Sequence, residues 1–158
     1  MPRDFPQPTA EEIESLIHAQ LHLEGPLLPI FHALQETYGH VPDSAIQPIA
    51  DALNITRAEV HGVMSFYHDF RKVPAGRHVV KICRAEACQS MGANALADAT
   101  LAKLGLAWHG TTPNGNVTVE PVYCLGLCAC APAVMVGETL HGRVDGEKMD
   151  AILKEAGA

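Results

Sequence analysis

Residues 78–88 of the chain read HVVKICRAEAC. The first six of these residues are rich in β-branched side chains, which predicts a short strand that ends on Cys83. Further along, residues 114–122 read NGNVTVEPV, where Asn-Gly is a turn signal and the alternation that follows predicts a second strand, with Cys124 two residues beyond it. If these two strands are neighbours in one sheet, the two cysteine-bearing loops lie at the same edge of that sheet.

Four of the five cysteines form two pairs with unequal spacing. Four residues separate Cys83 from Cys88, three separate Cys124 from Cys128, and 35 residues lie between the pairs. Four convergent thiolates suit either tetrahedral zinc or an iron–sulfur cluster. Zinc pairs are most often two residues apart, so the wider loops and their small Gly and Ala neighbours favour a cluster in which each pair holds one iron. A structural zinc module and a pair of redox disulfides stay open as alternatives. Cys130 is expected to be a non-ligand thiol.

The remaining pattern of residues 76–158 predicts an α/β domain around these cysteines. A helix is expected over residues 93–104, a third strand over 133–137, a weaker fourth over 140–144, and a last helix from a cap at Asp145 through Glu155. The order is thus β-α-β-β-β-α.

Residues 9–73 predict a separate helical domain. Capping boxes begin at Thr9 and Thr56, and apolar residues recur at helical spacing over 13–21, 27–38, 43–53 and 56–66. Residues 1–8 are expected to be a disordered lead-in. The fold class is therefore mixed, with a helical bundle followed by an α/β domain.

Composition and missing motifs exclude several function classes. The chain has 158 residues and a formal net charge of −7, which argues against nucleic acid as a partner. No stretch approaches the roughly 20 apolar residues that cross a bilayer, and no apolar targeting segment is visible, so we expect a cytoplasmic protein without membrane insertion. There is no glycine-rich phosphate loop and no nucleophile motif, so no catalytic residue is assigned to this chain. His18 and His22 have a possible metal spacing but are expected to lie on a solvated helix face.

The combined pattern resembles the thioredoxin-like [2Fe–2S] ferredoxin family. The resemblance is carried by the cysteine spacing, by CLGLCACAP at residues 124–132 and by LPIFHALQETYG at residues 28–39, and it extends from about residue 11 to 155. That family includes the 24-kDa subunit of respiratory NADH dehydrogenase and small subunits of NAD-linked hydrogenases and formate dehydrogenases. The resemblance implies a thioredoxin-like domain with one [2Fe–2S] cluster, and it places the four ligands at Cys83, Cys88, Cys124 and Cys128.

Within this family, CRAEACQSMG at residues 83–92 looks most like the gamma subunit of molybdenum-containing, NAD-dependent formate dehydrogenase. This likeness implies an electron-transfer subunit that is not itself catalytic. Its expected partners are a beta subunit that binds FMN and NAD and an alpha subunit that holds the molybdenum cofactor. The alternative parent enzymes are respiratory NADH dehydrogenase and NAD-linked hydrogenase.

Overall fold

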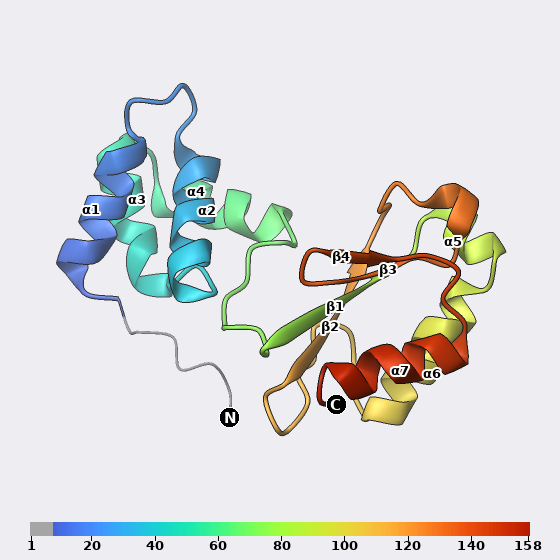
Figure 1. Ribbon diagram of the computed structural model, residues 1–158. Coiled ribbons are helices and arrows are strands. Elements are labelled where there is room, and N and C mark those ends of the chain that lie inside the picture. The colour runs from blue at the N-terminus through green and yellow to red at the C-terminus, as the bar shows by residue number, and fades with distance from the viewer. Residues whose placement is uncertain (1–7) are drawn as a thin grey trace. The chain divides into compact units, whose positions relative to one another are not determined.

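The computed structural model describes residues 8–158, which divide into two compact units with a boundary between Pro74 and Ala75 (Figure 1). The expected lead-in, apart from Pro8, lies outside the described residues. Each unit has its own apolar core. No helix within residues 8–158 combines the length and the apolar character needed to cross a membrane.

The first unit consists of helices α1 (Ala10–Gln20), α2 (Leu27–Tyr38), α3 (Ile46–Leu53) and α4 (Arg57–Phe66). Thr56 caps α4 as its sequence predicts: its Oγ1 accepts a hydrogen bond from the Glu59 amide at 3.2 Å, and the Glu59 carboxylate accepts one from the Thr56 amide at 2.7 Å. The helix expected over residues 43–53 is shorter than predicted, since Asp43–Ala45 forms a 3-10 turn (η1) before α3 begins. The core of this unit includes Ile30, Phe31, Leu34, Ile46, Ile49 and Val60, all without solvent exposure.

The second unit is built on a four-stranded sheet with the order β2-β1-β3-β4. Its strands are β1 (His78–Cys83), β2 (Val117–Val122), β3 (Val134–Val136) and β4 (Thr139–His141). β1 pairs in parallel with β2, whereas β3 is antiparallel to both β1 and β4. β1 and β2 are thus neighbours in one sheet, which is the condition under which the sequence predicts that the two cysteine-bearing loops lie together.

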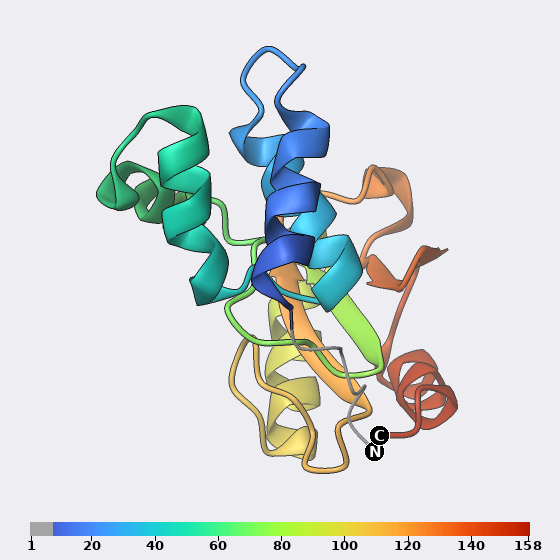
Figure 2. The same cartoon turned by 90° about the vertical axis from the view of Figure 1, so that its left-hand side faces the viewer.

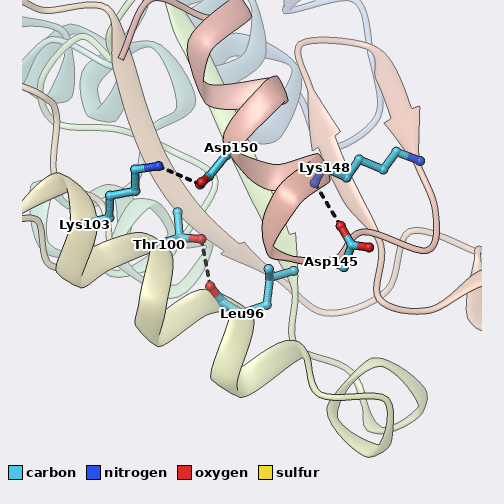
Figure 3. Close-up of polar contacts among 6 residues, drawn as sticks. All are labelled: Leu96, Thr100, Lys103, Asp145, Lys148 and Asp150. Atoms are coloured by element: carbon cyan, nitrogen blue, oxygen red, sulfur yellow. Dashed lines mark hydrogen bonds and ion pairs between the residues drawn. The ribbon is translucent and has the colours of Figure 1, made fainter.

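Helices α6 (Ala93–Leu104) and α7 (Gly146–Glu155) lie on one side of this sheet (Figure 1). Ala97 of α6 and Met149 of α7 share a buried cluster with Val80, Ile82 and other sheet residues. The two helices run in different directions: in Figure 2, α7 is seen nearly end-on, whereas α6 is seen from the side. An ion pair of 2.7 Å between Lys103 and Asp150 joins them at the surface (Figure 3).

Local sequence accounts for the start of α7 and the end of α6. Asp145 caps α7, since its carboxylate accepts a hydrogen bond from the Lys148 amide at 2.9 Å (Figure 3). Gly105 ends α6 with a φ of 64°, a conformation that glycine adopts without steric cost. The mixed α/β fold class is confirmed. Two elements are new: a five-residue helix, α5 (Glu86–Ser90), begins between the first two cysteines, and a 3-10 turn, η2 (Cys128–Cys130), begins at Cys128; neither is predicted.

Candidate cluster site

The four cysteines of the expected site lie at one edge of the sheet. Cys83 is the last residue of β1, and Cys88 lies in α5. Cys124 comes two residues after β2, and Cys128 begins a 3-10 turn (η2, Cys128–Cys130). Cys83 pairs in register with Val122, so the two parallel strands end together and release both loops at the same place. This pairing is what converts two separate sequence motifs into one site.

The thiols approach one another in two pairs, and there is also an electrostatic interaction between the two pairs. The Sγ atoms of Cys124 and Cys128 are 3.9 Å apart. The pKa of the Cys88 thiol is raised, first by burial and then by its hydrogen bond with Cys83, and negative charge on Cys83 and Cys128 raises it further. The pKa of Cys128 is raised first by its hydrogen bond with Cys124, and charge on Cys83 also contributes. Both shifts include a contribution from a thiol of the other loop, so the two pairs lie near each other.

This mutual effect defines what the site can hold. Charge on neighbouring thiols makes Cys88 and Cys128 harder to ionise, so thiolates gathered here are favourable only with a cationic centre among them. Among residues 8–158, no three His, Cys, Asp or Glu side chains are gathered closely enough to hold one metal ion. An arrangement in two pairs fits a two-iron cluster, in which each iron takes two thiolates, better than it fits a single zinc ion.

The two pairs differ strongly in their exposure to solvent. Cys83 and Cys88 are 1% and 2% exposed, whereas Cys124 and Cys128 are both exposed. The buried pair packs against Ala93, Ala131 and Ala133. The site therefore has an inner half within the protein and an outer half at its surface, a difference that the cysteine spacing does not reveal.

Backbone amides donate hydrogen bonds to the sulfur atoms of both halves. The Gly126 amide lies 3.3 Å from the Cys124 Sγ. A bond from the Ala133 amide acts on Cys88 and opposes the rise in its pKa. Gly126 has a φ of 77° and Cys124 a φ of 131°, so the loop takes a positive-φ path that brings this amide back to the sulfur. Such bonds stabilise thiolate charge and are one way in which a protein tunes a bound cluster.

Comparison with known proteins gives the same cofactor. Residues 13–157 match the family model described as thioredoxin-like [2Fe-2S] ferredoxin. The chain is 35% identical over 151 residues to the HndA subunit of the NADP-reducing hydrogenase of Solidesulfovibrio fructosivorans, an alignment that covers 96% of this chain and 88% of the relative. It is also 35% identical over 149 residues to a subunit of the NADH-quinone oxidoreductase of Escherichia coli K12, covering 92% and 90% of the two chains.

A solved structure shares the fold. The crystal structure of an NAD+-reducing [NiFe]-hydrogenase in the air-oxidized state superposes with a TM-score of 0.67 and 22% identity, over 83% of this chain and 22% of that chain. At this identity the likeness concerns the fold alone. The match of the family model to residues 13–157, together with the two relatives, identifies the chain as a member of the thioredoxin-like [2Fe–2S] ferredoxin family, with a [2Fe–2S] cluster as its cofactor.

Proposed function

We propose that Cys83, Cys88, Cys124 and Cys128 hold the cluster, and that the chain is an electron-carrying subunit of an NAD-linked oxidoreductase complex. The observation that carries the proposal is the meeting of two thiol pairs at the common end of β1 and β2. When bound, a [2Fe–2S] cluster supplies storage of a single electron. The relatives named above are subunits of a hydrogenase and of an NADH-quinone oxidoreductase, which supports a role within a larger assembly.

The unequal exposure of the four cysteines indicates the side of the site through which electrons pass. Cys83 and Cys88 hold their half of the site away from water, and the amides of Gly126 and Ala133 stabilise thiolate charge on either side. The half formed by Cys124 and Cys128 is open to the surface, so it is the side at which a partner's redox centre can approach. An electron therefore enters and leaves through the outer half.

Replacing each of the five cysteines in turn with serine tests the ligand assignment. The full chain, purified without oxygen, should contain about two iron and two sulfide per molecule. Substitution of Cys83, Cys88, Cys124 or Cys128 should reduce the iron content or change the visible spectrum, whereas Cys130→Ser, the matched control, should leave both unchanged. A chain that holds about one zinc ion instead, or a Cys130→Ser variant that alone loses iron, would contradict the assignment.

The specific parent complex that we propose is a molybdenum-containing, NAD-dependent formate dehydrogenase. The support is the sequence of residues 83–92, which resembles the first cysteine loop of the gamma subunits of that enzyme. In such a complex this chain would contact a beta subunit that binds FMN and NAD, and an alpha subunit would hold the molybdenum cofactor.

Isolating the complex through a tag on this chain distinguishes the candidate enzymes. Formate-driven reduction of NAD+ by a complex that contains molybdenum would support the proposal. Hydrogen-driven reduction with nickel in the complex would identify a hydrogenase instead. Transfer of electrons from NADH to a quinone would identify a respiratory NADH dehydrogenase.

A further inference from the structure

Arg84 follows Cys83 directly, and its side chain is held in a fixed position. Its Nε and Nη2 atoms donate hydrogen bonds to the Asn94 Oδ1 at 3.3 and 3.2 Å. The guanidinium also lies over the ring of Trp108, with Cζ 5.4 Å from the ring centroid. The residue is half-buried. A hydrogen-bond fork and an aromatic stacking contact together restrain a side chain that is usually flexible.

The same residue closes a ring of hydrogen bonds around the first cysteine loop. The Arg84 amide donates to the Val122 carbonyl at 2.7 Å and so extends the pairing of β1 with β2 past Cys83. The Arg84 carbonyl accepts a bond from the Gln89 side chain at 2.7 Å, and Gln89 follows Cys88 directly. The Gln89 side chain in turn accepts a bond from the Asn94 amide group at 3.2 Å. Arg84, Gln89 and Asn94 therefore link the residue after each inner cysteine to the start of α6.

We propose that Arg84, which follows the inner ligand Cys83 directly in the chain, raises the reduction potential of the cluster through its restrained positive charge. The proposal rests on the ligand assignment given above, in which Cys83 and Cys88 bind one iron. Reduction adds one negative charge to the site, and a nearby cation favours the more negative state. Because Arg84 is half-buried and its guanidinium is restrained, salt screens its effect less than that of an exposed charge. An arginine keeps its charge at all working pH values, so its effect is constant.

The test compares two arginines that flank the same strand. Arg84→Gln removes a charge at the cluster end of β1, whereas Arg77→Gln removes an exposed charge just before the other end, roughly 20 Å away at about 3.3 Å per residue. The reduction potential of the full-length, cluster-loaded chain is measured by redox titration followed by EPR, at low and at high salt. We expect Arg84→Gln to make the reduction potential more negative. The shift should be about three times that of Arg77→Gln or larger, and most of it should remain at high salt. Equal shifts in the two variants, or loss of the difference at high salt, would overturn the proposal.

Two further variants separate charge from structure. Arg84→Lys keeps the positive charge but loses the fork and the stacking contact, and it should retain most of the wild-type potential. Asn94→Asp has nearly the same shape and keeps an acceptor for Arg84, but it loses the bond to Gln89 and places a negative charge on the guanidinium, and it should lower the potential; Asn94→Leu, which loses the bond to Gln89 without adding charge, is its control. If Arg84→Gln does not hold its cluster, Asn94→Asp decides: an unchanged potential in that variant would overturn the proposal. A wild-type chain that does not contain about two iron atoms would contradict the ligand assignment itself. If the chain contains two iron atoms but its reduction potential is the same in all these variants, only the role of Arg84 would be overturned.

Discussion

Replacing Ile82 with alanine tests how firmly the strand that delivers Cys83 is held. Ile82 has no solvent exposure and lies in β1, opposite Pro121 of β2 and Val134 of β3. The substitution removes three buried carbon groups, each worth about 0.8 kcal/mol of transfer free energy, or about 2.4 kcal/mol together. A strand paired on both sides cannot collapse into the space, so the cavity adds about 1 kcal/mol. We expect the free energy of unfolding of the second unit to fall by about 3–4 kcal/mol.

The chain carries its own probe for this measurement. Trp108 is the only tryptophan, and it lies in the same unit as Ile82, so its fluorescence follows the unfolding of that unit. In anaerobic urea titrations of variants with equal iron content, the contribution of the cluster is common to all and cancels. With a slope of about 1.5 kcal/mol per molar urea, the midpoint should fall by roughly 2 M.

Two control variants make the result decisive. Ile82→Val should cost about 1 kcal/mol. Leu140→Ala changes a side chain in the same sheet that is 48% exposed, and it should cost less than about 0.5 kcal/mol. The reasoning would be refuted if Ile82→Ala and Ile82→Val were equivalent, or if Leu140→Ala were as costly as Ile82→Ala.

Three further predictions concern contacts at helix ends and surfaces. Thr56→Ala should cost about 1 kcal/mol of stability in thermal unfolding, since it removes the side-chain cap of α4. The Thr56 amide, and to a smaller extent its hydroxyl, hold the pKa of Glu59 below its usual value. The substitution removes only the contribution of the hydroxyl, so the difference from wild type should shrink slightly as the pH falls through that lowered pKa, and a difference that grows at low pH would contradict this. Lys103→Ala should change stability by less than about 0.5 kcal/mol, because both partners of its ion pair are more than half exposed. Gly142→Ala should destabilise by about 1–3 kcal/mol, because its new Cβ would lie 2.9 Å from the Cβ and 3.0 Å from the carbonyl oxygen of Cys130; an unchanged melting temperature would show that this turn can shift.

Elements whose limits depend on neighbouring residues could be predicted from the sequence. The capping boxes at Thr9 and Thr56 display both hydrogen-bonding partners within four residues. Gly39 ends α2 in the left-handed conformation that its position predicts, with a φ of 74°. The short helix α5 gives no such signal: it has five residues and no side-chain cap, so it depends on contacts made elsewhere in the fold.

The meeting of the two cysteine loops was predictable from the sequence, but the depth of each loop was not. The spacing of the cysteines indicated two loops at one edge, on the condition that β1 and β2 were neighbours, and the parallel pairing meets that condition. The contrast between buried Cys83 and exposed Cys124 depends on which alanines pack around the inner loop, and these come from distant parts of the chain. The ring through Arg84 likewise joins three segments whose proximity no local pattern encodes. Ligation by the four cysteines stays a prediction until the serine variants are measured.

The unequal depth of the two halves has a consequence for how the holoprotein is made in the cell. If the four thiols hold the cluster as proposed, a carrier that delivers iron and sulfide can reach Cys124 and Cys128 from outside, but not Cys83 and Cys88. The outer thiols are then the natural acceptors in the handover, and the inner loop must open briefly for the transfer to be completed. On this reading, loading the cluster requires a movement of the inner loop as well as the transfer of iron and sulfide, and in the proposed complex it would have to precede the contact of a partner with the outer side.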